Sequence, residues 1–291
     1  MKPTFLLGAG VGWAATNPLR HTLREVCNVG RIREHHYLNL LCGQGTKKAM
    51  INHCIKWEKR NKIYEAQPVI DWLRQPVSFE SYLSYYKKLY DATDISMVGD
   101  VSNSNYELPE EFLIEALARI KEHYNVKAYM IFRDPVRRTW SHMNHRYFDN
   151  NDVRNRLRRG NTTFYDFLNA EILNDWSTTY IQNLEKYQRH VDTLPIVMEE
   201  LWEGDSDAEL ELISTHIGAR VDTLYDNNYS PDRGINFKRT NRKVRDQWSD
   251  RLELTSEVYY QIKQILQPTY DAWVDKFGSL PLYWGTPLTY Q

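Results

Sequence analysis

Several features that would assign a chain to a common class are missing here. There are only three cysteines in 291 residues, an odd number without metal-type spacing, so a reduced intracellular protein is favoured over a disulfide scaffold. No apolar run approaches the length of a membrane span and no signal peptide is visible, so we expect no membrane span and a cytoplasmic location. The 37 basic and 38 acidic residues give a net charge of −1, which offers no global electrostatic case for binding nucleic acid.

What is present is an alternation of short apolar runs with amphipathic segments. The runs predict buried strands, and the segments between them carry a helical period. Strands are expected at 4–7, 31–34, 95–99, 128–131 and 194–198, and helices at 109–123, 207–217 and 254–276, with further helical stretches within 43–92 and 163–191. This pattern predicts an α/β fold with a parallel sheet covered on both faces, in a single domain spanning residues 1–291.

One junction has the residue types of a phosphate site. Asp134 is a suitable N-cap and Pro135 a suitable first residue for a helix that follows the apolar run 128–131. Arg133 then stands at the carboxyl end of a strand, and Ser141 lies two turns into the helix. An arginine, a hydroxyl and a helix N-terminus can together hold a phosphate. A solvated surface helix is the alternative on this local pattern.

A glycine-rich loop follows the first strand. Gly10, Gly12 and Ala15 match the dinucleotide fingerprint G-x-G-x-x-A, with Glu34 about 20 residues later, so a Rossmann oxidoreductase is a competing interpretation. An NTPase is less well supported, because the loop contains no lysine and no G-K-[ST] sequence.

Pro18 argues against the Rossmann geometry. A helix that began near Gly12 would contain this proline, at a cost of about 3 kcal/mol. If instead Asn17 is the N-cap, Pro18 takes the tolerated first position. The loop from Gly10 to Asn17 is then long enough for its backbone N–H groups to hold a phosphate.

The stretch Arg133-Asp134-Pro135-Val136-x-Arg138-x-x-Ser141 resembles the motif with which sulfotransferases hold the 3′-phosphate of 3′-phosphoadenosine-5′-phosphosulfate (PAPS). The resemblance implies that Arg133 and Ser141 contact this phosphate and that Arg138 is structural. The loop is similar to the family's 5′-phosphosulfate loop, which implies a nucleotide-binding set of Gly12, Trp13, Ala14, Ala15, Thr16 and Asn17. It also implies a three-layer α/β/α, P-loop NTPase-like fold, the product adenosine 3′,5′-bisphosphate (PAP), and no metal.

Trp13 stands where the family's loop has a lysine that neutralises charge on the leaving oxygen. An indole offers one neutral N–H donor and no charge, and losing such an electrostatic contact costs roughly 3–4 kcal/mol in comparable sites. Two hypotheses follow. Either Arg20, Lys47 or Lys48 substitutes for the lysine, or the protein binds the nucleotide and transfers poorly or not at all.

The segment Arg33-Glu34-His35-His36-Tyr37 is similar to the K-E-x-H-F signature of carbohydrate sulfotransferases. By this match Glu34 is the catalytic base, and His36 is a second candidate because an imidazole titrates near neutral pH. An ordinary polar loop is the alternative.

Two weaker matches complete the prediction. The segment 99–106 resembles a family segment that borders the acceptor, which makes Asp100 and Ser102 candidates for acceptor binding. Lys238 and Arg239 stand in a basic run where relatives close over the nucleotide. The sequence therefore predicts a PAPS-dependent sulfotransferase that acts on a small-molecule or glycan hydroxyl. A PAPS- or PAP-binding protein without transfer activity is the first alternative and an NAD oxidoreductase a distant second; oligomeric state is open.

Overall fold

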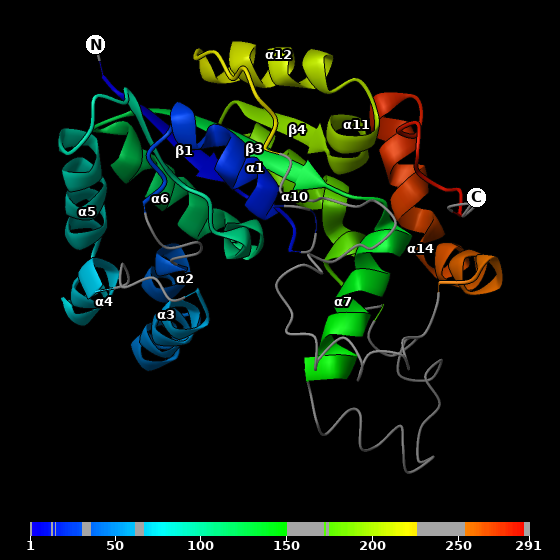
Figure 1. Cartoon of the computed structure of the whole chain (residues 1–291), viewed down its shortest axis with the longest axis horizontal. Helices are drawn as coiled ribbons and strands as arrows, with labels where there is room; N and C mark the ends of the chain where they lie inside the picture. The colour runs from blue at the N-terminus through cyan, green and yellow to red at the C-terminus, as the bar shows by residue number, and fades with distance from the viewer. Residues whose placement is uncertain are drawn as a thin grey trace. The chain divides into compact units, whose positions relative to one another are not determined.

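The computed structural model describes residues 2–12, 14, 16–30, 36–61, 67–149, 172, 175–225 and 254–287. The chain divides into two compact units. The sheet unit comprises Met1–Ile131, Asn183–Ile196 and Asp207–Tyr225, and the α7 unit comprises Phe132–Gln182, Val197–Ser206 and Asp226–Gln291. Figure 1 labels their elements. The single domain expected from the sequence stays a prediction.

A four-stranded sheet forms the centre of the sheet unit. Its strands are β1 (Thr4–Gly8), β2 (Met97–Asp100), β3 (Asn125–Phe132) and β4 (Thr193–Val197), in the order β2-β1-β3-β4. β1 runs parallel to β2 and to β3, with Thr4 opposite Met97 on one side and Asn125 on the other. The predicted parallel sheet is therefore confirmed. Parallel neighbours require crossover connections, which bring helices over the sheet.

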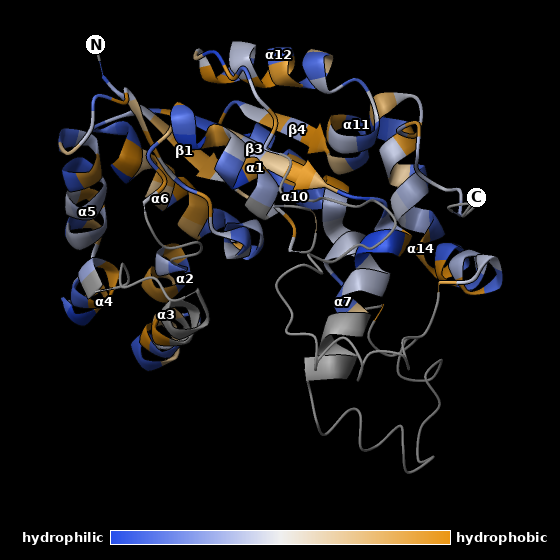
Figure 2. Cartoon of the chain, viewed as in Figure 1, coloured by the Kyte–Doolittle hydropathy of each residue, from blue (hydrophilic) through white to orange (hydrophobic). Residues whose placement is uncertain are grey.

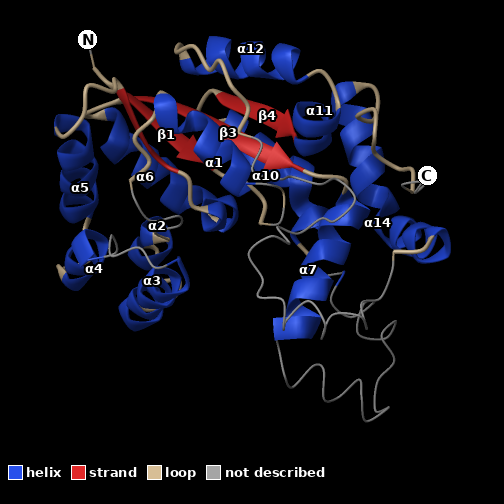
Figure 3. Ribbon diagram, in the orientation of Figure 1, coloured by secondary structure: helices blue, strands red, loops and turns tan. Residues whose placement is uncertain are grey.

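Helices flank this sheet (Figure 3). The helices of this unit are α1 (Thr16–Thr22), α2 (Tyr37–Leu41), α3 (Lys47–Asn61), α4 (Gln67–Arg74), α5 (Phe79–Asp91), α6 (Glu110–Lys121) and α12 (Ser206–Ile217), with the 3₁₀ turns η1 (Leu23–Glu25) and η2 (Asn103–Glu107) and most of the helix α10 (Tyr180–Gln188). The predicted helices at 109–123 and 207–217 are confirmed as α6 and α12. The strand expected at 31–34 lies outside the described residues.

The core of this unit explains the apolar runs. Phe5, Leu6 and Leu7 of β1 are fully buried, as are Met130 and Ile131 of β3, and both strands are coloured as hydrophobic in Figure 2. Continuous apolar sequence is typical of a parallel strand covered on both faces, since neither set of side chains meets water.

Aromatic side chains of α2, α4 and α5 form a second part of this core. The Trp72 ring is stacked on Tyr37, with centroids 4.3 Å apart, and on Tyr85, with centroids 3.9 Å apart. Tyr86 meets Phe5 of β1 edge to face at 4.9 Å. Such pairs contribute roughly 0.5–1.5 kcal/mol beyond the area they bury. These aromatic rings, conspicuous in the sequence, hold α2, α4 and α5 to the sheet.

The α7 unit is built from helices. It contains α7 (Pro135–Asp149), η3 (Trp176–Thr179), α11 (Met198–Glu203) and α14 (Ser256–Phe277). Thr255 caps α14 by accepting from the Val258 N–H, and Gly278, with φ of 82°, ends it in the left-handed conformation that favours glycine. The expected helix at 254–276 is thus confirmed. In the described part of the chain, no helix is both long and apolar enough to cross a membrane.

Candidate functional site

The loop between β1 and α1 is held against the end of β3. The Ala9 N–H donates to the Tyr129 carbonyl (2.9 Å), and the Val11 N–H donates to the Ile131 carbonyl (3.3 Å). A Cβ on Gly10 would lie 2.4 Å from Cγ2 of Thr16, so the loop passes where only a glycine fits. The first part of the loop, residues 9–11, is therefore fixed at the carboxyl end of the central strand, where open α/β sheets bind ligands.

The first turn of α1 corrects one expectation. The helix begins at Thr16, so Asn17 is a helical residue and not the N-cap, and Pro18 is the third residue. The proline is tolerated because the first four N–H groups of a helix have no partner within it. The conclusion that the helix starts well after Gly12 is confirmed.

The proposed nucleotide-binding residues of this loop differ in how far the structure describes them. Gly12 and Ala14 are buried and Thr16 is half-buried. Trp13 and Ala15 lie outside the described residues, as does the side chain of Asn17.

Two of the three cations that could substitute for a lysine at position 13 have hydrogen-bond partners in the sheet unit. Arg20 is buried, and its guanidinium donates to the Gly30 carbonyl (2.8 Å). Lys47 donates through Nζ to the Gln75 carbonyl at 2.5 Å, while Lys48 is exposed.

In the α7 unit, Asp134 caps α7 as predicted. Its Oδ1 accepts from the Arg137 N–H at 2.9 Å, and Pro135 is the first helical residue. Its Oδ2 accepts from the hydroxyls of Tyr259 (3.0 Å) and Tyr270 (2.9 Å), and also from the Gly285 N–H (3.0 Å). The carboxylate thereby ties the start of α7 to α14 and to the segment after it.

Arg133 and Ser141 are each only 5% exposed. The Arg133 carbonyl accepts from the Tyr180 hydroxyl (3.0 Å), which fixes the backbone just before the cap. A charged side chain is seldom buried unless something pairs with it. The alternative interpretation from the sequence, a helix whose polar side chains are solvated, therefore does not apply to Arg133 and Ser141.

Glu199, which the sequence analysis did not identify, holds the backbone between β3 and α7 in place. It is fully buried in α11, with Oε1 accepting from the Asp134 N–H and Oε2 from the Trp284 indole N–H, both at 3.0 Å. Burial raises the pKa of this carboxyl from 4.5 to about 7, with the charge of Asp134 adding to the rise and that of Arg133 opposing it. No local signal marks this role, because Glu199 follows Asp134 by 65 residues.

Arg138 occupies a structural position, as the family resemblance implies. It is fully buried and pairs with Asp175, with its guanidinium 5.4 Å from the centroid of the Trp176 ring. Asp175 also accepts from Thr139 (3.1 Å) and Ser177 (2.6 Å) through its side chain. Burial opposes ionisation of this carboxyl, yet its hydrogen bonds and the Arg138 charge hold its pKa well below the usual range.

His36 is held in an unusual backbone conformation in the sheet unit. Its φ is 50°, and it is the one non-glycine residue with positive φ in the described part of the chain. Such a residue costs of order 1–3 kcal/mol and persists where its surroundings fix it. Its N–H donates to the Ser102 hydroxyl (3.1 Å), its carbonyl accepts from the Leu40 N–H (3.2 Å), and its ring Nδ1 lies 2.5 Å from Oγ of Ser104.

Hydrogen bonds connect the predicted acceptor-side residues Asp100 and Ser102 to this histidine. Asp100 is fully buried at the end of β2, with Oδ2 accepting from the Tyr82 hydroxyl and Oδ1 from the Ser102 N–H, both at 3.0 Å. Ser102 in turn accepts from the His36 N–H. Burial, followed by the Asp100 charge, raises the pKa of Tyr82 well above 10. The structure therefore brings together Asp100, Ser102 and His36, whereas Glu34 lies outside the described residues.

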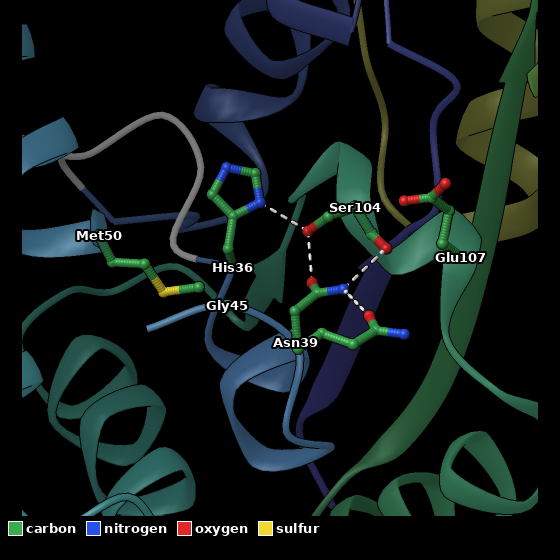
Figure 4. A pocket seen from close by; sticks show the side chains of 7 residues that line it. His36, Asn39, Gly45, Met50, Ser104 and Glu107 are labelled. Carbon is green, nitrogen blue, oxygen red and sulfur yellow. Dashed lines mark hydrogen bonds between the residues drawn. The ribbon is translucent and has the colours of Figure 1, made fainter. Parts of the chain in front are cut away.

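A pocket of about 530 Å³ opens beside His36 (Figure 4). It is lined by residues with polar side chains together with a glycine and a methionine: His36, Asn39, Gln44, Gly45, Met50, Ser104 and Glu107. None of these seven residues, which are those of the described part of the chain, is a lysine or an arginine. The sequence analysis missed Asn39, Gln44, Ser104 and Glu107, because their place in the same pocket as His36 depends on how η2 meets α2.

Two further expectations concern groups elsewhere. Lys238 and Arg239 lie outside the described residues. Within the described ranges, no cluster of three or more histidine, cysteine, aspartate or glutamate residues is arranged to hold a metal ion.

Comparison with known proteins identifies the fold. No protein-family model and no curated protein sequence matches the chain. Among solved structures, it is similar to a sulfotransferase from Alicyclobacillus acidocaldarius, with a TM-score of 0.56, 14% identity, and coverage of 97% of this chain and 98% of that one. This similarity shows that the chain has the P-loop-like α/β fold of sulfotransferases, as the motif resemblance predicted.

Two other sulfotransferase structures are more distantly similar. One, from Mycobacterium avium, has a TM-score of 0.47, 13% identity, and coverage of 96% of this chain and 77% of that one. The other is a mouse sulfotransferase complexed with PAP, with a TM-score of 0.42, 13% identity, and coverage of 90% and 88%.

Proposed function

We propose that the protein is a sulfotransferase that moves a sulfuryl group from PAPS to an acceptor hydroxyl and releases PAP. The observation that carries the proposal is the location of the motif Arg133–Ser141. In a chain with the sulfotransferase fold, it begins directly after β3, with Asp134 capping α7 and both phosphate-binding candidates buried. Burial of an arginine beside a helix N-terminus suits an anionic ligand.

In this proposal, different residues bind the 3′-phosphate and the 5′-phosphosulfate of the nucleotide. Arg133 and Ser141 bind the 3′-phosphate, with Lys238 and Arg239 as further contacts. The loop from Gly12 to Asn17 binds the 5′-phosphosulfate through backbone N–H groups. That role is consistent with a loop whose first residues, Ala9 and Val11, are hydrogen-bonded to β3, because a fixed backbone needs no reorganisation when the anion binds.

Transfer requires an acceptor oxygen to attack the sulfur while the bond from sulfur to the phosphate oxygen breaks. The electron pair of that bond leaves with PAP, and the acceptor proton passes to a base. Glu34 and His36 are the two candidates for this base. Asp100 and Ser102 support the acceptor side by holding the backbone of His36. Catalysis then comes from positioning, electrostatics and one proton transfer. A glycan acceptor, absence of a metal and a cytoplasmic location stay predictions from the sequence.

A second candidate function is nucleotide binding without transfer. Trp13 favours it, since no charge stands at the position of the family lysine. Single-turnover transfer of labelled sulfuryl from PAPS to a panel of glycans, lipids and phenols separates the two. We expect transfer in the wild type and its loss in Arg20→Ala, with Arg24→Ala, at an exposed arginine of η1, as the matched control. No transfer in the wild type with a gain in Trp13→Lys would establish the binding function instead.

Two separate measurements, turnover and PAP affinity, test the proposed base and the proposed 3′-phosphate contacts. Glu34→Gln and His36→Gln are expected to leave PAP affinity nearly unchanged, and the one that replaces the base lowers turnover by roughly 10²–10⁴-fold. Arg133→Ala is expected to weaken PAP binding by about tenfold or more, because it removes a charged hydrogen bond from a buried site. Unchanged PAP affinity in Arg133→Ala would remove this motif from the nucleotide site.

A further inference from the structure

A chain of hydrogen bonds beside the pocket determines where the proton of His36 resides. It begins at the backbone carbonyl of Ser104, which can only accept. The Asn39 side chain donates to this carbonyl through Nδ2 at 3.3 Å, and to Oε1 of Gln44 at 2.8 Å. The backbone carbonyl thereby fixes the amide of Asn39 with its nitrogen toward these acceptors and its oxygen on the other side.

The Asn39 oxygen faces the hydroxyl of Ser104 (Figure 4). An amide oxygen accepts and cannot donate, so Ser104 gives its hydroxyl hydrogen to Asn39. The Ser104 oxygen then has only lone pairs to offer to Nδ1 of His36, 2.5 Å away. The imidazole must therefore donate from Nδ1.

We propose that Asn39 and Ser104 are positioning residues that hold His36 as the Nδ1–H tautomer, so that Nε2 is the atom that accepts the proton of the acceptor hydroxyl. The inference rests on the proposed function, and of the two candidate bases, Glu34 and His36, it assigns the role to His36. As the acceptor oxygen bonds to sulfur, its proton moves to Nε2, and PAP leaves with the electron pair of the broken bond. The imidazolium then keeps its Nδ1–H bond to Ser104, which also stabilises the charged ring.

The backbone of His36 supports this arrangement. Its left-handed conformation is fixed by the Ser102 hydroxyl and by the first turn of α2, and this backbone carries the ring onto Ser104. Glu107 is the other titratable side chain that lines the pocket within the described residues. A base whose tautomer is set by a fixed partner is the arrangement that general-base catalysis by histidine requires.

The tautomer can be measured without any activity. Long-range ¹H–¹⁵N correlation spectra of ¹⁵N-histidine-labelled protein, at about pH 8.5 where an ordinary imidazole is neutral, distinguish a protonated Nδ1 from a protonated Nε2. His36→Gln assigns the signal. We expect Nδ1–H in the wild type, a mixture or Nε2–H in Ser104→Ala, and Nδ1–H again in Ser104→Thr, which restores the hydroxyl. Ser84→Ala, at an exposed serine of α5, is the matched control and should leave the spectrum unchanged.

The chemical role is measured on the same variants by single-turnover transfer from PAPS to the glycan, lipid and phenol panel. Ser104→Ala should lower the rate roughly ten- to hundredfold with PAP affinity unchanged, and Ser104→Thr should restore most of it. Nε2–H in the wild type would overturn the inference whatever the activity. An Nδ1–H signal with no transfer to any acceptor would overturn the proposed function and leave the tautomer in place. Transfer unaffected by Ser104→Ala, despite a changed tautomer, would exclude His36 as the base.

Discussion

Gly10 is placed where the loop after β1 has room for hydrogen only. A Cβ at this position would lie 2.4 Å from Cγ2 of Thr16 and 2.7 Å from Cγ2 of Ile131. We expect Gly10→Ala to lower the free energy of unfolding by roughly 1–3 kcal/mol, as overpacking of a buried site does. Urea unfolding measures the change. Thr16→Ser removes the nearer methyl group, so Gly10→Ala should destabilise the Thr16→Ser variant less than it destabilises the wild type. A loss of the same size in both backgrounds would contradict this account.

Glu199 makes stability depend on pH in a defined window. Its pKa in the folded protein is about 7 against an ordinary 4.5, so between these values the folded state holds a proton that the unfolded state has released. Stability from this group is therefore complete below about pH 4.5 and is lost as pH rises through 7. Because one pKa unit corresponds to about 1.4 kcal/mol, the loss is roughly 3 kcal/mol.

Glu199→Gln tests this directly, since glutamine does not titrate. It should be less stable than the wild type at pH 5, because both oxygens of the protonated carboxyl can still accept an N–H, whereas the –NH₂ nitrogen of glutamine cannot. The gap in unfolding free energy should narrow as pH rises to about 8. Glu257→Gln, at an exposed position in the first turn of α14, serves as the control. A gap that stays constant from pH 5 to 8 would show that Glu199 is ionised in the folded state throughout this range.

At the scale of elements, Asp134 joins α7 to α14 through one carboxylate. Three donors converge on its Oδ2, from Tyr259, Tyr270 and Gly285. Asp134→Asn places an –NH₂ group against these donors or against the Arg137 N–H, so we expect a loss of roughly 3–5 kcal/mol in chemical unfolding. Tyr270→Phe removes a single donor and should cost only about 1–2 kcal/mol. Equal losses in the two variants would argue that packing of α14, and not the carboxylate, holds the two helices together.

The sequence predicts those elements whose signals are local. The four strands appear as apolar runs, and the cap of α7 is encoded by the adjacent residues Asp134 and Pro135. The predicted start of α1 at Pro18 is two residues late, because Asn17 is a suitable cap in isolation and only the tertiary contacts of the loop decide where the helix begins. The residues that brace the candidate site could not be predicted, since Glu199 lies 65 positions from Asp134 and Ser104 lies 68 from His36. Their pairing depends on the sheet order β2-β1-β3-β4, which no single segment encodes.

For the molecule as a whole, ligand binding should appear as added thermal stability. A ligand that binds only the folded state contributes about 2.7 kcal/mol at a hundred times its dissociation constant. For a chain of this size that corresponds to a rise of about 5–10 °C in Tm. We expect this rise with PAP and a much smaller one with ATP or NAD, measured by differential scanning fluorimetry. Ser141→Ala should reduce the shift with PAP. A larger shift with NAD would favour an oxidoreductase and contradict the proposed function.

The aromatic stack of Tyr37, Trp72 and Tyr85 has a practical consequence for spectroscopy. Trp72 lies between two phenol rings at 4.3 Å and 3.9 Å, and Tyr37 is bonded through its backbone to His36. The emission of an indole is sensitive to the rings stacked on it, so a movement of His36 that displaced Tyr37 would change the fluorescence of Trp72. Trp72 is thus an optical probe stacked on the residue that follows the candidate base. Comparison with Trp72→Phe separates its emission from that of the other eight tryptophans, so filling of the pocket beside His36 can be followed in real time without an attached dye.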